Sequence, residues 1–341
     1  MITANSSVNS TNRIPELDVL RGFAAIVVMI YHYTVVFSSM VDHIDYRVYV
    51  PYGVYAVHLF FIISGFVISM TLEHTHRPMD FVVSRFSRLY PVFWVAVLLT
   101  QSVVWLSPHT EFSVSWRDAL ANLTMVAEVF HAPLVDNVYW SLVIELIFYI
   151  IIFFIWRYGL LPKIEFLVIP WCLFQILAAY SYSFIGYQCP QVITVALLLK
   201  YAHLFMAGIL FYRLRTIGEN ISTLLLIVAC LCTEFLVQGS SAGIFCVGFF
   251  IIFYFLVRNK LNVIAIKPLI FIGSISYSLY LIHQNIGFEI MLRMKDYPKI
   301  VQLIVASLAV ILLSWGLRVT VEIPSMRWVR SLYKRVYRSQ I

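Results

Sequence analysis

Apolar stretches of about 20 residues recur along almost the whole chain, and this pattern restricts the fold to one that crosses a membrane many times. Backbone polar groups inside a bilayer must be satisfied within the protein, so each stretch is expected to form a helix. The sequence therefore predicts an all-α fold, a polytopic integral membrane bundle of about ten transmembrane helices with both termini cytoplasmic. The expected spans are 17–38, 54–72, 88–106, 139–156, 164–183, 192–212, 222–238, 241–257, 269–291 and 301–320.

The composition supports this fold class, because 61% of the residues are hydrophobic, 12% are charged and the mean hydropathy is +0.87. These values exclude a soluble globular protein. The chain divides into a short polar segment at 1–12, a membrane domain at 13–325 and a basic cytoplasmic tail at 326–341. The polar segment has no basic region that leads into a cleavable apolar core, so the first span is expected to direct insertion.

The positive charges, which give a net charge of +7, indicate orientation in a membrane rather than nucleic-acid binding. With both termini cytoplasmic, about eighteen of the 24 Lys and Arg residues lie on the cytoplasmic side, as the positive-inside rule requires. The basic tail is then expected to lie at anionic lipid headgroups. Arg293, Lys295 and Lys299 depart from the rule, because they would lie outside.

The first span carries two polar side chains, Arg21 and His32, within the apolar run from Leu17 to Phe37. Ionisable groups inside a membrane segment are costly and are functional candidates for that reason. Their spacing of eleven residues is close to three helical turns, so both side chains emerge on one face, roughly 16 Å apart along the axis. This arrangement indicates a lined cavity rather than a lipid-facing surface.

A pair of arginines, Arg85 and Arg88, precedes the third span, and residues three apart on a helix project to the same side. One interpretation is a pair of positive-inside anchors. The other is a phosphate clamp, because guanidinium groups match phosphate oxygens in bidentate geometry. Arg21 lies at the same cytoplasmic end and would be the third member. Three arginines at one mouth suit a polyphosphorylated cofactor that arrives from the cytosol.

The fourth span contains Glu145, a carboxylate that must pair, protonate or line a polar cavity inside the membrane. Its depth in the span is similar to that of His32 in the first span. If the two helices touch, Glu145 would orient the His32 ring, as a carboxylate orients a histidine base in other enzymes. The alternative is a structural His–Glu pair that stabilises the bundle.

Other polar residues in the spans have less specific interpretations. His283, which follows Tyr280, binds an acceptor or is a packing histidine. Lys200 and His203 are expected to form a similar pair in the sixth span. Two carboxylates near span ends are expected to extend to the headgroups. They are Glu234 and Glu289. The five cysteines form no disulfide framework, and no metal-ligand spacing or glycine-rich phosphate loop is present, so no metal is expected.

Taken together and in order, these segments resemble the membrane acyltransferase-3 family, the bacterial O-acyltransferases of cell-surface polysaccharides, in its stand-alone form. Each match alone is weak, and the ordered set is specific. Ala56 departs from the glycine that is usual before the Phe-Phe segment. The matching segments are 17–25 with His32, 57–66, 85–91, 140–145, 205–208, 272–283 and 322–324.

The resemblance implies a ten-helix acyltransferase in the bacterial cytoplasmic (inner) membrane. It implies acetyl-CoA as the usual donor and a glycan or lipid-linked saccharide as the acceptor. His32 and the Arg85–Arg88 pair correspond to essential positions of the family, with Arg21 and Glu145 also carried over. A sugar hydroxyl needs a positioned base, which typically contributes 10²–10⁴-fold, and His32 is expected to be that base. Glu145 is expected to orient His32 or to be the base itself.

The acceptor is expected to contact a polar corner made by Trp140 and Ser141, together with Tyr280 and His283. An interfacial anchor is the other interpretation of Trp140. Acetyl, succinyl and longer acyl groups fit the same sequence, and direct attack and an acyl-enzyme route are both open. The membrane domain completes the transfer by itself or with a separate periplasmic partner. The competing function is a polysaccharide or lipid-linked sugar translocase without covalent chemistry.

Overall fold

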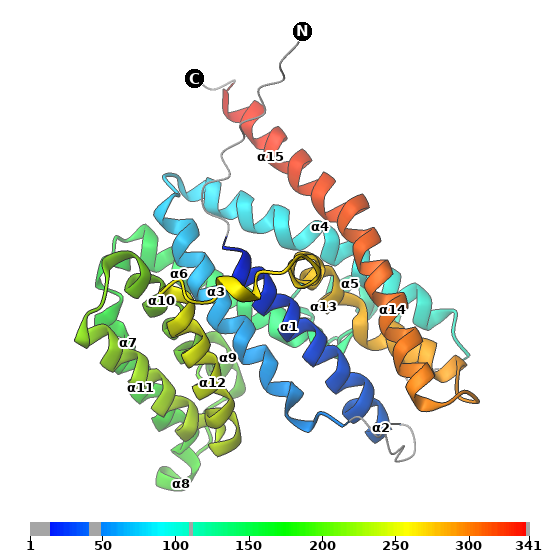
Figure 1. Ribbon diagram of the computed structural model, residues 1–341, viewed down its shortest axis with the longest axis horizontal. Coiled ribbons are helices and arrows are strands. Elements are labelled where there is room, and N and C mark those ends of the chain that lie inside the picture. Colours follow the sequence, from blue (N-terminus) through cyan, green and yellow to red (C-terminus); the bar gives the residue numbers. More distant parts are fainter. Residues whose placement is uncertain (1–13, 41–48, 109–111, 339–341) are drawn as a thin grey trace.

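The computed structural model describes residues 14–40, 49–108 and 112–338, and within these ranges the chain is helical and contains no strand. Figure 1 shows long helices packed side by side and joined by short loops. The α-helices are α1 Pro15–Tyr31, α2 Phe37–Met40, α3 Ala56–Glu73, α4 Pro78–Trp105, α5 Trp116–Asn122, α6 Trp140–Arg157, α7 Glu165–Ala179, α8 Ser181–Ile185, α9 Gln191–Ala196, α10 Ala202–Ile217, α11 Ile221–Gln238, α12 Ser240–Val257, α13 Lys267–Arg293, α14 Lys299–Leu317 and α15 Ile323–Arg338. Two π-helical turns, η1 His32–Val36 and η7 Arg318–Glu322, continue α1 and α14.

Within the described residues, seven helical segments are long and apolar enough to cross a membrane, so the chain is a multi-pass membrane protein. They coincide with seven of the expected spans. They are Pro15–Met40, Pro51–Glu73, Pro78–Trp105, Asn137–Arg157, Ile221–Gln238, Ser240–Val257 and Lys299–Tyr337.

The other three expected spans take different forms. The fifth corresponds to α7, which has 15 residues, and the ninth to α13, which has 27 residues and many polar side chains. The prediction of one continuous sixth span at 192–212 is wrong. The chain there breaks between α9 and α10, where Leu198 has a left-handed backbone with φ of 53°. A total of ten spans is therefore not established by length and composition.

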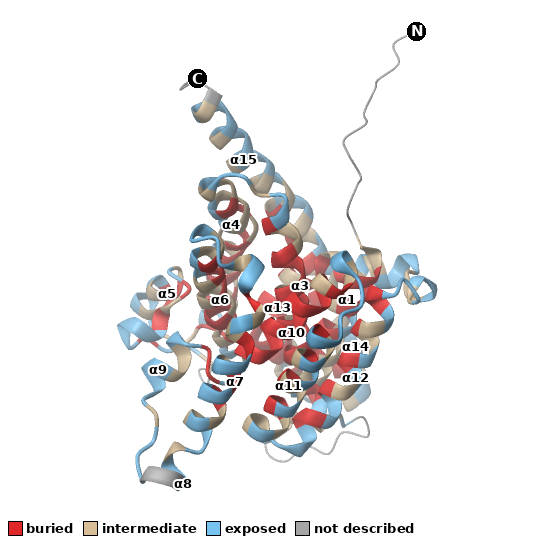
Figure 2. Cartoon of the chain, turned by 90° about the vertical axis from the view of Figure 1, so that its left-hand side faces the viewer, coloured by how far each residue is buried: buried red, intermediate tan, exposed pale blue. Residues whose placement is uncertain are grey.

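The centre of the bundle contains α1, α3, α10 and α13, and Figure 2 shows that buried residues concentrate there. Two glycines allow the closest approaches between helices. A Cβ on Gly273 of α13 would lie 1.7 Å from the carbonyl oxygen of Asp18 in α1, and a Cβ on Gly65 of α3 would lie 2.0 Å from that of Phe205 in α10. Small residues at such contacts let membrane helices pack backbone to backbone.

The helices α1 and α13 run in the same direction with a constant register. Gly22 contacts Gly273, and His32 contacts His283, and both pairs are 251 residues apart in the sequence. Farther along, the Tyr33 hydroxyl donates a hydrogen bond of 2.7 Å to the His283 carbonyl. His32 and Tyr33, in the turn η1 that continues α1, are therefore both held at the level of His283 in α13.

The C-terminal segment is not an isolated tail. It continues α14 through η7 into α15, which crosses α4 in Figure 1. The Arg330 guanidinium donates a 3.2 Å hydrogen bond to Ser87 of α4, and the Arg77 guanidinium lies 4.5 Å from the centre of the Tyr337 ring. Most of the expected basic tail is thus a helix packed on α4, the helix that carries Arg85 and Arg88.

Candidate active site

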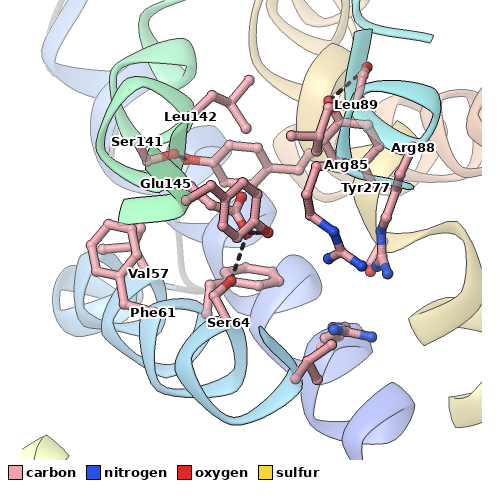
Figure 3. A pocket seen from close by; sticks show the side chains of 16 residues that line it. Val57, Phe61, Ser64, Arg85, Arg88, Leu89, Ser141, Leu142, Glu145 and Tyr277 are labelled. Atoms are coloured by element: carbon pink, nitrogen blue, oxygen red, sulfur yellow. Dashed lines mark hydrogen bonds between the residues drawn. The ribbon is translucent and has the colours of Figure 1, made fainter. Parts of the chain in front are cut away.

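A narrow cavity of about 80 Å³ lies where α1, α3, α4, α6 and α13 meet, and Figure 3 shows the side chains that line it. Arg21 from α1 and the pair Arg85 and Arg88 from α4 reach it together, as their positions in the sequence predict. Glu145 and Tyr149 of α6 line the same cavity. Three guanidinium groups and one carboxylate therefore share a space enclosed by five helices.

Arg85 has no carboxylate among its hydrogen-bond partners in the described residues. Its Nη2 lies 3.4 Å from the Thr71 hydroxyl and 3.3 Å from the Ser84 hydroxyl, and its guanidinium lies 5.7 Å from the centre of the Tyr149 ring. Its Nε is buried and has no partner among these residues. A buried donor without an acceptor is costly, so this side chain is suited to an anion that supplies one. Arg21, by contrast, has a carboxylate partner, because its Nη1 lies 3.6 Å from Oδ1 of Asp18 on the same helix.

Glu145 is held on the opposite wall of the cavity by two hydroxyl groups. The Ser64 hydroxyl of α3 donates a 2.6 Å hydrogen bond to its Oε1, and the Tyr149 hydroxyl donates a hydrogen bond to the same oxygen. Tyr149 lies four residues after Glu145, so the two side chains are neighbours on one helix face. The carboxylate is thereby fixed toward α3 and the arginines.

Two further hydroxyl groups of the cavity connect α6 to α13. Ser141 and Tyr280 both line it, and their oxygens are 2.5 Å apart. The Tyr280 hydroxyl also contacts the Val138 carbonyl at 3.1 Å. The Tyr277 hydroxyl donates to the Leu89 carbonyl at 3.0 Å and fixes α13 against α4, as the dashed line in Figure 3 shows.

His32 pairs with His283, and their contacts define the tautomers of both rings. His283 Nδ1 lies 3.0 Å from the Tyr280 carbonyl, and His32 Nδ1 lies 2.8 Å from the Val28 carbonyl. Because a carbonyl only accepts, both Nδ1 atoms carry the proton. His283 Nε2, 3.1 Å from His32 Nδ1, is then an acceptor. The lone pair of His32 therefore lies on Nε2, where a base needs it.

The structure does not join His32 to Glu145. The packing of α1 against α13 directs His32 to His283, and the carboxylate of Glu145 is held by Ser64 and Tyr149. The expected orientation of the His32 ring by Glu145 is therefore wrong, and His283 takes that position. His32 does not line the cavity itself; its partner His283 contacts Tyr280, which does line it, with 5.7 Å between the two ring centres.

A second and wider cavity, of about 600 Å³, begins on the other side of an aromatic cluster. Trp140 and Tyr201 line it, and their rings contact Phe61, which lines the first cavity. The centre of the Phe61 ring lies 5.0 Å from the centre of the Tyr201 ring and 6.4 Å from the centre of the Trp140 ring. The three rings separate the two cavities. Trp140 thus faces the wider cavity, and Ser141 faces the narrow one.

Three expectations about polar residues are wrong. Glu234 and Glu289 do not extend to the headgroups, because they are 0% and 1% exposed. Lys200 and His203 do not form a pair: Lys200 is exposed, and His203 contacts Gln175 and Glu234. Glu234, Glu289 and His203 are turned toward the interior of the bundle, and hydropathy does not encode that direction.

Sequence reasoning missed several residues of the site. Tyr149 had a usable signal, because it follows Glu145 by four residues. Ser64 and Tyr277 lie in the matched segments 57–66 and 272–283 but had no chemical signal of their own. Arg330 reaches Ser87, next to Arg88, from a helix 243 residues farther along the chain, and no local pattern indicates such a contact.

The loop before α6 is fixed near the histidine pair by Asp136. Its carboxylate accepts hydrogen bonds from the backbone N–H groups of Val138 at 3.2 Å and Asn285 at 3.1 Å. Asn285 lies two residues after His283. Burial raises the pKa of Asp136 from 3.8 to about 7, although both hydrogen bonds act in the opposite direction.

Comparison with known proteins establishes the class of this chain. The family model described as Acyltransferase domain matches residues 14–319, which is most of the 341 residues. The chain belongs to this acyltransferase family. The resemblance to the membrane acyltransferase-3 family is therefore confirmed, and the cavity described above is the candidate active site of an acyltransferase.

One relative of this acyltransferase is the Acyltransferase MdmB of Streptomyces mycarofaciens, which is 28% identical over 179 residues. The match covers 49% of this chain and 45% of the relative, so the chain spans less than half of that protein's length. No solved structure matches the acyltransferase.

Proposed function

We propose that this acyltransferase moves an acyl group, acetyl from cytosolic acetyl-CoA, to a hydroxyl of a cell-surface or lipid-linked glycan in the bacterial inner membrane. Both termini are then cytoplasmic. The observation that carries the proposal is the narrow cavity, where Arg21, Arg85 and Arg88 converge and Arg85 keeps a buried donor without an acceptor. The alternative, a polysaccharide or lipid-linked sugar translocase without covalent chemistry, needs no clamp for the phosphates of a cofactor.

The arginines bind the phosphates of the donor. Guanidinium groups form bidentate hydrogen bonds with phosphate oxygens, and the donor carries a diphosphate and a 3′-phosphate. The acylated arm then extends from the arginines along the cavity toward Ser141 and Tyr280. The cavity of about 80 Å³ holds only a few water molecules, so donor binding requires movement of the side chains that line it.

His32 removes the proton from the acceptor hydroxyl at Nε2, the ring atom left without hydrogen by the contacts of Nδ1. The hydroxyl oxygen attacks the thioester carbonyl, and the carbonyl electrons move to its oxygen. Collapse of this intermediate breaks the carbon–sulfur bond, and the proton on Nε2 passes to sulfur. The products are the ester and free CoA. During the step His283 Nε2 accepts the Nδ1–H of the charged His32 ring. Tyr280 must move aside to admit the substrates to His32.

The acceptor occupies the wider cavity. Its wall contains the rings of Trp140 and Tyr201, and the amides of Gln188 and Gln191 lie nearby. Sugar rings stack on aromatic faces and use amides for hydrogen bonds, as ligand sites combine apolar walls with a few polar groups. Ser141 and Tyr280 would place the hydroxyl that reacts. Glu145, fixed by Ser64, is the alternative base.

The test is release of CoA from acetyl-CoA by purified membranes, with and without a glycan extract of the host. The wild type is expected to release CoA only when glycans are present. His32→Ala is expected to lower kcat by about 10²–10⁴-fold. Arg85→Lys is expected to raise KM for acetyl-CoA about tenfold or more, because the fork that binds phosphate is lost.

Two control variants change exposed residues of the same type, His131→Asn and Arg157→Lys, and are expected to behave as wild type. Equal rates for wild type and His32→Ala would remove His32 as the base and leave Glu145. Absence of CoA release by folded wild type with several acyl donors would reject acyl transfer to these glycans. Movement of labelled saccharide across the membrane in that experiment would support the translocase.

A further inference from the structure

Three helices, α3, α11 and α12, each direct one metal-type donor to the same buried point, and a histidine of α10 lies beside it. His58 of α3, His203 of α10, Glu234 of α11 and Cys246 of α12 are between 0% and 4% exposed. The mechanism uses none of them. Their separation in the sequence, 188 residues from His58 to Cys246, explains why no motif indicated them.

The distances within this His–Glu–Cys cluster are those of groups that share one centre. His58 Nδ1, one carboxylate oxygen of Glu234 and Cys246 Sγ all lie within 4.8 Å of one another. Sγ is 3.5 Å from Glu234 Oε1 and 3.8 Å from His58 Nδ1. A tetrahedral zinc ion with ordinary bond lengths separates sulfur from nitrogen or oxygen ligands by about 3.5 Å. The 2.7 Å between His58 Nδ1 and Glu234 Oε1 must widen by about 0.6–0.8 Å to reach the same geometry.

Gln175 determines the tautomer of His203. The backbone N–H of His203 can only donate, and it faces Gln175 Oε1 at 3.5 Å, which identifies that atom as oxygen. His203 Nδ1 lies 2.7 Å from the same oxygen and must donate to it. His203 Nε2 therefore carries the lone pair when the ring is neutral. It lies 2.5 Å from Glu234 Oε2, so a proton lies between the two atoms and His203 fixes this carboxylate oxygen.

The charge of the cluster limits which cation fits. Glu234 is fully buried in a membrane bundle, and its ion pairs in the described structure are to His58 and His203. A buried carboxylate needs compensation close by. A divalent ion bound to one carboxylate, one thiolate and one neutral imidazole compensates both negative charges. Without the ion, the Cys246 thiol keeps its proton and donates a 3.5 Å hydrogen bond to Glu234 Oε1.

We propose that this cluster binds one zinc ion through His58 Nδ1, Cys246 Sγ and Glu234, with a water molecule as the fourth ligand. Binding expels the thiol proton, and the proton of His58 moves from Nδ1 to Nε2, so one proton leaves as one Zn²⁺ enters. The donor set of nitrogen, oxygen and thiolate sulfur suits zinc, and His203, held by Gln175, fixes the other carboxylate oxygen of Glu234 as outer-shell partners orient metal ligands. The ion joins α3, which forms one wall of the active site, to α11 and α12 behind it.

The experiment measures the metal content of the full chain, purified in detergent without chelator, by mass spectrometry. The wild type is expected to contain about one zinc per chain. Cys246→Ser and Glu234→Gln are expected to lose most of it. Cys230→Ser is the matched control, because Cys230 is equally buried in α11 and is not part of the cluster. After exchange with Co²⁺, the wild type and Cys230→Ser are expected to show a thiolate-to-cobalt charge-transfer band that Cys246→Ser lacks.

Folded wild type with no stoichiometric metal and no cobalt band would overturn the proposal in favour of a protonated thiol. Equal metal loss in Cys230→Ser and Cys246→Ser would identify the metal as adventitious and would also overturn it. If Glu234→Gln does not fold, the conservative Cys246→Ser decides the question alone. Metal content does not depend on acyl transfer, so the result stands whether or not the proposed reaction is found.

Discussion

Substitutions of His283 can distinguish a role in positioning His32 for the reaction from a purely structural role. His283 Nε2 accepts the Nδ1–H of His32, and the Val28 carbonyl shares that proton. We expect His283→Ala to lower kcat about tenfold with KM for acetyl-CoA unchanged, because one acceptor is lost and one remains. We expect His283→Gln, whose amide oxygen also accepts, to restore most of the rate. Steady-state kinetics of both variants check this. A loss as large as that of His32→Ala would instead place His283 at the chemistry.

Asp136 is expected to make the stability of the fold depend on pH. Its pKa is raised from 3.8 to about 7 by burial, so the folded state favours the protonated form. This contribution to the free energy of unfolding is full below about pH 4, falls as the pH rises to about 7 and is constant above it. Thermal melts in detergent between about pH 5 and pH 8 measure how steeply the stability falls as the pH rises. Asp136→Asn is expected to flatten this slope, and an unchanged slope would assign the dependence to another group.

The contact between α1 and α13 sets the geometry of the site at the level of whole helices. A Cβ at Gly273 would lie 1.7 Å from a backbone oxygen of α1, so Gly273→Ala must push the two helices apart. We expect a loss of stability of about 1–3 kcal/mol or more and weaker activity, since His32 moves away from His283. The control is Gly248→Ala in α12, where a Cβ meets no atom within 4 Å and stability is expected to be equal or higher. Thermal melts that are equal for the two variants would contradict this account.

The orientation of the whole molecule is open to a direct test through Cys189. This half-buried cysteine lies in the connection between α8 and α9, on the side proposed to face the periplasm. An impermeant maleimide is expected to label it in spheroplasts, and Cys189→Ser is expected to lose the label. A cysteine in place of Lys260, in the exposed connection between α12 and α13, is expected to react only after permeabilisation. The reverse pattern would place both termini outside and would reject a cytosolic donor.

The sequence predicted elements and local neighbours better than it predicted partners. The convergence of Arg21 with Arg85 and Arg88 could be predicted, because hydropathy and charge place all three at the same end of their helices. The partner of His32 could not be predicted, because many helices carry residues at the same depth in the membrane. Depth does not show which helices are neighbours or which way each helix face points. Glu145 had a similar depth, yet the glycine contact at Gly273 selected α13 as the neighbour of α1.

The predictions about the buried polar groups were wrong for a related reason. A position near the end of an apolar window predicts nearness to the headgroups, and on that basis the sequence predicts that Glu234 extends to them. The structure turns it inward to His58 and His203, so the direction of a side chain around the helix decided its environment. The break between α9 and α10 was missed because Leu198, an apolar residue, adopts the left-handed backbone there, and no glycine or proline marks the turn.

The shared register of α1 and α13 also has a consequence for how the protein is made. His283 is added 251 residues after His32, and at about 5–20 residues per second the ribosome needs roughly 13–50 s to reach it. During that interval the first helix is already synthesised and His32 is without its partner from α13. The contact between these two helices therefore forms only after most of the chain has been synthesised.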